Sequence, residues 1–272
     1  MVRAFWQSRL AVAVFGVAAS VLGVAVWVHD RGKPLYIPLT AIVLLAVLCM
    51  FAGQMAGRII AGSVNTRCLS LLHVQLDPQA FLRAYEGVPG RLKEGSREYA
   101  LACAYLAEGY AAAGEFDRAM DTLRSGFAGE GGEDLTLKGL YFHTMASCAL
   151  SGENLPRAEE AVAGLEQAAA DSRESNPGLA QSMEESLTLC RNRLAALKGE
   201  PVDTAWLEER LKRTPFALRR LEILQTLARQ AAAEGRREEA LSRLEQMERQ
   251  AGKTFFRGWA ERARQVLDRD GL

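Results

Sequence analysis

Cysteine and histidine are the residue types in this chain best able to bind a metal or to act as a nucleophile or base. The five cysteines are scattered, with no close pair that could hold zinc or cycle as a dithiol. No histidine has a second histidine or a carboxylate at the spacing of a helical metal site. These residues are Cys49, Cys68, Cys103, Cys148, Cys190, His29, His73 and His143. We therefore expect no metal and no cofactor, and unpaired thiols are typical of a reducing compartment.

Glycine motifs and paired acids give no sign of catalysis either. The sequence has no phosphate-binding glycine loop, nucleophile elbow or dinucleotide fingerprint. Adjacent acids such as Glu159 and Glu160 diverge by about 100° around a helix, which is typical of solvated surface. We expect no catalytic residues and no small-molecule substrate, and an enzyme whose site assembles only in the fold is the least favoured class.

The charge balance argues against general nucleic-acid binding. The chain has 33 Lys and Arg against 33 Asp and Glu, so its formal net charge is zero, whereas nucleic-acid binding depends on neutralising phosphates with a basic excess. Two arginine pairs, Arg219–Arg220 and Arg236–Arg237, are either solvated, paired with nearby glutamates, or bound to a phosphate or lipid.

The N-terminal part contains two uncharged apolar runs, at residues 10–28 and 35–56. Each is long enough to cross a hydrocarbon core, which needs ~20 helical residues, and the connector of residues 29–34 is short enough for a turn. The runs predict a two-span transmembrane hairpin. The alternative for the first run is a signal peptide, because a basic start and an apolar stretch also describe one.

Basic residues at the flanks of the spans predict their orientation. Arg3, Arg9, Arg58 and Arg67 lie outside the hairpin, and the positive-inside rule then places both termini and the rest of the chain in the cytoplasm. We expect an integral protein of a bacterial inner membrane. Small residues four apart, such as Gly16 and Ser20, indicate either packing of the two spans on each other or association with another membrane protein.

The remainder of the chain has the start and stop signals of helices. Asp77–Pro78, Asn176–Pro177 and Thr214–Pro215 combine a capping residue with proline at the first helical position, and Gly114, Gly152, Gly199 and Gly235 supply the stops. No alternating strand pattern competes with these helices. A last helix, predicted from Phe255 to Leu267, would close the stack.

Residues 106–123, LAEGYAAAGEFDRAMDTL, predict two helices that meet at Gly114. Ala107, Tyr110, Gly114, Phe116 and Ala119 follow in order the pattern of a small residue, an aromatic, a turn glycine, an aromatic and an alanine. This stretch resembles the tetratricopeptide repeat, although Cys103 stands where that family has a large aromatic residue. The pattern recurs near Gly152 and Ala158 and again near Gly235 and Ala240.

The gap between the last two alanines is about twice the first gap, so a fourth, weaker helix pair is expected at residues 176–213. Asn192 and Arg193 occupy the place of a small residue there. We therefore predict an all-α fold: a transmembrane hairpin at residues 1–60, juxtamembrane helices and a linker at 61–94, and three to four tetratricopeptide-like helix pairs with a capping helix at 95–272. This arrangement is similar to that of bacterial inner-membrane proteins of the HemY type.

The family resemblance implies a concave surface that binds protein segments. The predicted function is a membrane-anchored adaptor with a cytoplasmic groove for a protein partner; the alternative is a structural subunit held in a membrane complex through its spans. The predicted partner-binding residues are Glu108, Ala111, His143, Ser147, Glu222, Gln225 and Arg229. The competing interpretation is that these positions are ordinary helix surface or pack against the weak pair.

Overall fold

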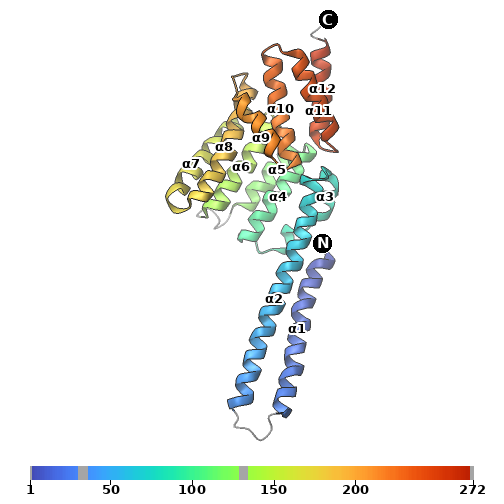
Figure 1. The fold of residues 1–272 in the computed structure, drawn as a ribbon, viewed down its shortest axis with the longest axis vertical. Coiled ribbons are helices and arrows are strands. Elements are labelled where there is room, and N and C mark those ends of the chain that lie inside the picture. Colours follow the sequence, from blue (N-terminus) through green and yellow to red (C-terminus); the bar gives the residue numbers. More distant parts are fainter. Residues whose placement is uncertain (1, 30–35, 129–133, 270–272) are drawn as a thin grey trace. The chain divides into compact units, whose positions relative to one another are not determined.

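The computed structural model describes residues 2–29, 36–128 and 134–269, and within these ranges all regular secondary structure is helical (Figure 1). The chain divides into two compact units, residues 1–68 and residues 69–272. Its helices are α1 (Val2–His29), α2 (Tyr36–His73), α3 (Pro78–Tyr85), the 3₁₀ turn η1 (Pro89–Arg91), α4 (Arg97–Ala113), α5 (Phe116–Gly126), α6 (Leu135–Ser151), α7 (Leu155–Ser175), α8 (Pro177–Lys198), α9 (Thr204–Arg213), α10 (Ala217–Ala233), α11 (Arg237–Gln250) and α12 (Phe255–Arg269).

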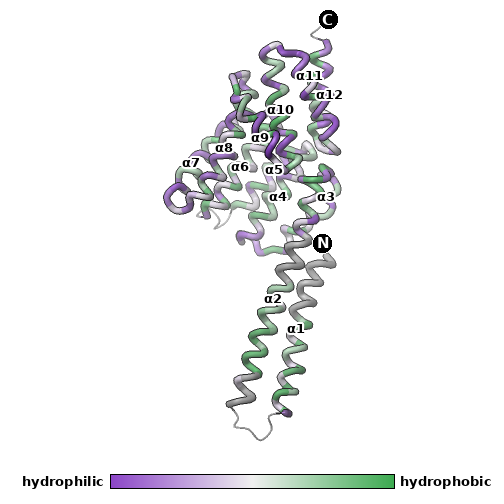
Figure 2. Tube along the Cα trace, in the orientation of Figure 1, coloured by the Kyte–Doolittle hydropathy of each residue, from purple (hydrophilic) through white to green (hydrophobic). Residues whose placement is uncertain are grey.

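The first unit consists of α1 and most of α2. The two helices approach closely at Gly23, where an added β-carbon would lie 3.5 Å from Ile42, whereas nothing lies within 4 Å of such an atom at Gly16. The helices therefore pack on each other at Gly23, a small residue of α1. Figure 2 shows mostly hydrophobic residues along the described parts of these helices, and their large apolar side chains are exposed.

The transmembrane prediction is wrong for the part of the chain that the structure describes. A helix must offer ~20 consecutive, predominantly apolar residues to cross a hydrocarbon core, and no described helix combines the required length with the required hydropathy. This finding contradicts the two spans at residues 10–28 and 35–56 and the localisation as an integral membrane protein with cytoplasmic termini. The predicted connector, residues 29–34, lies almost wholly outside the described residues.

Local capping signals account for most helix boundaries in residues 69–272. Asp77 and Asn176 accept hydrogen bonds from the backbone N–H groups of Ala80 and Leu179, so both predicted Asx-Pro starts are confirmed. Gly114 ends α4 with a φ of 88°, in the left-handed region that favours glycine.

Two predicted boundaries differ from the structure. Helix α10 begins at Ala217, two residues after Pro215, and its N-cap residue Phe216 makes no side-chain capping bond. Helix α6 does end next to Gly152, but that glycine has a φ of −83°. The left-handed residue is Glu153, with a φ of 57°, a conformation that is uncommon for a residue with a side chain.

Helices α4 to α7 form two helix pairs, and α10 and α11 form another. Neighbouring pairs pack through their first helices, with α4 on α6, α6 on α8 and α8 on α10. Ala107 and Ala119, the small residues predicted to bring α4 and α5 together, are both fully buried. The described residues thus form a helical repeat-like fold.

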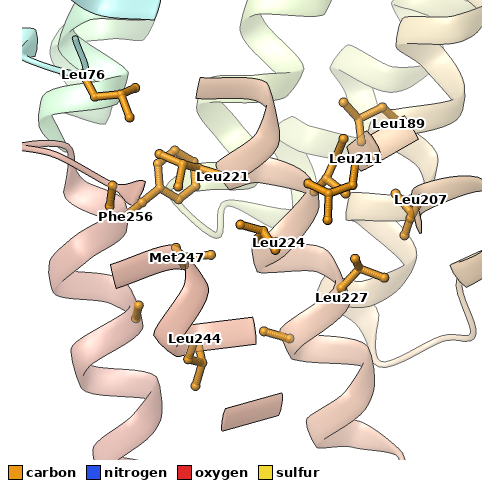
Figure 3. Close-up of a cluster of buried hydrophobic side chains, with 14 residues drawn as sticks. Leu76, Leu189, Leu207, Leu211, Leu221, Leu224, Leu227, Leu244, Met247 and Phe256 are labelled. Carbon is orange, nitrogen blue, oxygen red and sulfur yellow. The ribbon is translucent and has the colours of Figure 1, made fainter. Parts of the chain in front are cut away.

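The weak pair at residues 176–213 is held by the hydrophobic core of the C-terminal half. Figure 3 shows Leu189 of α8 and Leu207 and Leu211 of α9 gathered beside α10. The side chain of Asn192 also fastens the connection between α8 and α9, because its Oδ1 accepts a hydrogen bond of 2.7 Å from the backbone N–H of Asp203. Asn192, which departs from the repeat pattern, therefore has a structural role.

The C-terminal segment packs against the start of the same unit. The backbone N–H of Lys253 donates to the carbonyl of Leu76 at 2.9 Å, and the Lys253 ammonium forms an ion pair with Asp77. The rings of Phe255 and Phe116 meet edge to face at 5.1 Å. Helix α12, the predicted capping helix, thus contacts both the last and the first helix pairs.

Candidate functional site

The first helices of the successive pairs bring together a group of polar side chains that we call the inner polar cluster. Spacings of three or four residues place these side chains on the faces through which α4, α6, α8 and α10 pack. The inner polar cluster consists of Glu108 from α4, His143 and Ser147 from α6, Arg193 from α8, and Arg219, Glu222 and Gln225 from α10.

A buried ion pair lies at the centre of this cluster. Arg193 Nη1 lies 2.8 Å from Glu222 Oε1, and the two side chains are 4% and 10% exposed. Ser147 Oγ donates to Glu222 Oε1 at 2.5 Å, while Arg193 Nη2 donates to Ser151 Oγ at 2.8 Å. These hydrogen bonds and the ion pair are important for stability, because removing one partner of a buried pair typically destabilises a protein by about 3–5 kcal/mol.

The pKa of Glu222 reflects these partners. Burial by itself would raise it, but the charges of Arg193 and Arg219 and the hydrogen bond from Ser147 outweigh burial and lower the pKa of Glu222. Glu222 is therefore a carboxylate at neutral pH.

Arg219 and His143 form a second contact. Arg219 Nη2 lies 3.1 Å from His143 Nε2. Desolvation, together with the charge of Arg219, lowers the pKa of His143 to about 4, so the imidazole is neutral and its Nε2 accepts this bond. The other ring nitrogen, Nδ1, then carries the hydrogen and faces Cys190 Sγ at 4.0 Å.

Glu108 lies at the edge of the cluster beside His73, the last residue of α2. Glu108 Oε2 and His73 Nε2 are 3.4 Å apart, and the two side chains are 23% and 22% exposed. Desolvation, with a smaller contribution from the charge of Glu222, raises the pKa of Glu108 to about 7. Desolvation also lowers the pKa of His73. Near neutral pH Glu108 is therefore only partly ionised, and it lies beside a neutral imidazole.

Three buried polar atoms on α4, α6 and α10 have no hydrogen-bond partner within the described residues: Glu108 Oε2, Thr144 Oγ1 and Gln225 Nε2. The approach of His73 Nε2 to Glu108 Oε2, at 3.4 Å, does not form a hydrogen bond. Thr144 and Gln225 are only 1% and 3% exposed. Buried polar groups in folded proteins are nearly always satisfied, so these three atoms are unusual.

A pocket of about 380 Å³ adjoins the cluster. Its walls come from the start of α5, the turn between α6 and α7, and α12. We call it the α6–α12 pocket, and it is lined by Phe116, Ser151, Gly152, Glu153, Phe255, Trp259, Arg262, Ala263 and Val266. Ser151 joins the pocket to the cluster, because its hydroxyl group accepts the bond from Arg193.

Glu153 organises one side of this pocket. Its left-handed backbone accompanies two side-chain contacts of its carboxylate: Trp259 Nε1 donates to Oε1 at 3.2 Å, and Arg229 forms an ion pair with the same oxygen. The guanidinium of Arg229 also lies over the Trp259 ring, 5.1 Å from its centroid. The indole is thus held in place by two polar contacts.

The structure brings most of the predicted partner-binding residues together. Glu108, His143, Ser147, Glu222 and Gln225 belong to the inner polar cluster. Ala111 is a buried residue of α4, and Arg229 lies instead with Glu153 and Trp259 at the pocket. The bond between Glu222 and Arg193 is a contact with the weak pair, as the competing interpretation required. Whether any of these residues binds a partner stays a prediction.

Sequence reasoning missed Arg193, Ser151 and Arg219 as members of this network. The sequence offered one signal for Arg193, since it stands where the repeat pattern has a small residue. In the sequence Arg219 stood out only as half of an arginine pair. Its contact with His143 could not be recognised because the two residues are 76 positions apart in the chain.

The thiols of Cys148 and Cys190 are expected to be unreactive. Burial raises the pKa of Cys148 to about 12 and that of Cys190 to about 11, and a thiol that keeps its proton is a poor nucleophile. All five cysteines are free. Among the residues that the structure describes, no group of three or more histidine, cysteine or acidic side chains is placed to hold a metal ion.

Comparisons with known proteins identify no relative of this chain. No protein-family model, no curated protein and no solved structure matches it.

Proposed function

We propose that residues 69–272 form a protein-binding module of the tetratricopeptide type, which takes an apolar side chain of a partner segment into the α6–α12 pocket. The observation that carries this proposal is the pocket itself. Its volume of about 380 Å³ falls within the range of ~300–1,000 Å³ that is common for binding pockets.

The lining of the pocket supports recognition of a side chain. Phe116, Phe255 and Trp259 give it three aromatic walls, and aromatic side chains in well-packed pockets dominate the energetics of protein interfaces. Two of these rings are fixed against each other, and Trp259 is held by Glu153. A preorganised pocket loses little conformational freedom when a partner enters.

The experiment is a selection of peptides from a displayed random library on the full-length protein. The change to test is Val266→Asp, because Val266 lines the pocket and is 54% exposed, so the substitution adds a charge to the apolar site without disturbing the core. We expect selected peptides to share an apolar anchor residue and to bind the variant roughly thirtyfold more weakly, which corresponds to ~2 kcal/mol.

Gln265→Asp is the matched control, because it adds the same charge at the neighbouring, exposed position outside the pocket. Peptides should bind this variant as they bind the unchanged protein. Failure to select any peptide, or equal binding to the Val266 and Gln265 variants, would contradict the proposal.

A further inference from the structure

Arg262 belongs to the wall that α12 contributes to the α6–α12 pocket. Trp259, Arg262, Ala263 and Val266 all line this pocket, and their spacings of three and four residues place them along one side of the helix. Residues three and four apart on a helix are neighbours, so Arg262 lies next to both Trp259 and Val266. A partner segment that contacts either of these two side chains therefore comes within reach of the Arg262 guanidinium.

The positive charge of Arg262 is not matched by an acid of this protein. No carboxylate in the part of the chain that the structure describes forms an ion pair with Arg262, whereas Arg264, two positions further along α12, pairs with Glu248 at 3.1 Å. Arg262 is exposed, and its Nη1 lies 3.4 Å from the place that a β-carbon would take at Gly258. A guanidinium has five N–H donors, so Arg262 can pair with an acceptor that enters the pocket.

Glu153 is the other charged residue of the pocket lining, and its charge is already matched. Arg229 forms an ion pair with Glu153 Oε1, and Trp259 Nε1 donates a hydrogen bond to the same oxygen at 3.2 Å. The Arg229 guanidinium is also held over the Trp259 ring. When Arg229 is counted with the lining, the pocket has one positive charge left over, that of Arg262. The group that complements this charge is an acid.

We propose that the partner segment carries an Asp or Glu within two residues of its apolar anchor, and that this carboxylate pairs with Arg262 while the anchor occupies the α6–α12 pocket. The inference rests on the proposed protein-binding function and defines the chemistry of the partner. Arginine and a carboxylate form two parallel hydrogen bonds when they pair. Successive residues of an extended segment advance by ~3.3 Å, so an acid one or two positions from the anchor reaches the neighbouring side chain on α12.

The aromatic walls and Arg262 have different roles in this binding mode. An added β-carbon at Gly152 would lie 3.0 Å from the ring of Phe116, so that ring is closely packed against the backbone and offers the anchor a fixed surface. Arg262 lies at the exposed rim, where a charge affects the rate of association and the choice of partner more than the affinity. The walls therefore supply most of the affinity, and Arg262 selects segments that carry an acid.

The experiment extends the peptide selection to two variants of the full-length protein, Arg262→Gln and Arg262→Glu. Peptides selected on the unchanged protein should share an apolar anchor with an acidic residue within two positions of it. Arg262→Glu reverses the charge at the rim and repels such peptides. Selection on Arg262→Glu should therefore keep the apolar anchor and replace the neighbouring acid by Lys or Arg.

Binding of one selected peptide is then compared with that of its counterpart, in which Asn or Gln replaces the acid. Fluorescence anisotropy of the labelled peptides gives both affinities. We expect Arg262→Gln to weaken binding of the acidic peptide about three- to fivefold at low salt and to change binding of the counterpart little. The difference should disappear at about 1 M salt, because the charges are exposed. Arg269→Gln is the matched control, since it removes an exposed arginine of α12 that is not part of the lining, and it should leave both affinities unchanged.

The outcomes separate this inference from the proposed function. Peptides that share an apolar anchor and bind Val266→Asp weakly, but have no acid near the anchor, would overturn the inference and leave the proposed function standing. So would a basic residue beside the anchor on the unchanged protein, or equal binding of the acidic peptide to Arg262→Gln and Arg269→Gln. Failure to select any peptide, or equal binding to the Val266 and Gln265 variants, would overturn both.

Discussion

Two glutamates of the same cluster have opposite pKa shifts because their neighbours differ. Glu222 is bound by Arg193 and Ser147, and its pKa is lowered. Among the described residues, the group within ion-pair distance of Glu108 is the neutral imidazole of His73, and the pKa of Glu108 rises to about 7 because it is desolvated and faces the charge of Glu222. A buried carboxyl group thus remains ionised only where the fold supplies a cation and donors.

This difference predicts how Glu108→Gln changes stability with pH. The pKa of Glu108 is about 7 in the folded protein and 4.5 in its ordinary environment, so the folded state binds more protons in this window. The stability contributed by the protonated group is present below pH 4.5 and is lost as pH rises through 7. Gln cannot ionise and does not lose this contribution. As pH rises through 7, the free energy of unfolding of the variant should therefore increase relative to that of the unchanged protein, by up to about 3 kcal/mol.

Urea unfolding of both proteins at about pH 5 and pH 8 measures this effect. The lowered pKa of His143 also makes stability pH-dependent, but it does so in both proteins and largely cancels in their difference. A difference that is the same at both pH values would show that Glu108 is not the group that titrates.

At the scale of elements, the pairing of α4 with α5 depends on small side chains. Ala107 and Ala119 are fully buried, and Tyr110 is 3% exposed. The Tyr110 hydroxyl group donates to Glu86 at 2.8 Å, so the pair is also fastened to the segment that precedes it. Small residues at the helix contact allow close approach of the two backbones, and no space remains for a larger group.

Ala119→Glu should therefore destabilise the protein by about 2 to 4 kcal/mol, because it places an unpaired charge between packed helices. Glu115→Ala is the control. Its carboxylate forms an ion pair with Arg118, at 3.1 Å, and an exposed ion pair contributes less than ~1 kcal/mol. Thermal melts of the two variants test this comparison, and equal melting temperatures would exclude the packing of α4 on α5.

At the scale of the whole molecule, the C-terminal segment and residues 76–77 belong to one packed body. Phe256 is 1% exposed and shares a core with Leu76 and the helices α8 to α12 (Figure 3). The segment at Leu76 and the segment at Lys253 are also joined by a backbone hydrogen bond. Residues 69–272 should therefore unfold as one cooperative unit.

Phe256→Ala tests this cooperativity. The substitution should lower the free energy of unfolding by about 3–5 kcal/mol. It should also accelerate hydrogen exchange of the amides in both α12 and α3, because Phe256 of α12 shares a core with Leu76, which precedes α3. Val266→Ala, at an exposed position of α12, should change neither. Fast exchange in α12 with unchanged protection of α3 would mean that the two ends open independently.

Local signals in the sequence were sufficient to predict most helices. The starts at Pro78 and Pro177, the stop at Gly114 and the capping helix from Phe255 depend on contacts within one or two helical turns, and such contacts can be recognised from neighbouring residues. The burial of Ala107 and Ala119 follows from the same periodic pattern. The start of α10 was misplaced because Thr214 and Pro215 precede the helix without capping it.

The inner polar cluster was decided by the tertiary structure. Glu222 and Ser147 are 75 residues apart and Arg193 and Ser151 are 42 apart, so their contact depends on how successive helix pairs pack. The predicted transmembrane hairpin was wrong for a different reason, since no described helix combines the length with the hydropathy that a span requires. Sequence by itself determined the helices because their hydrogen bonds are local; only the fold determined which polar groups were desolvated, paired or left unsatisfied, because burial arises from residues distant in the chain.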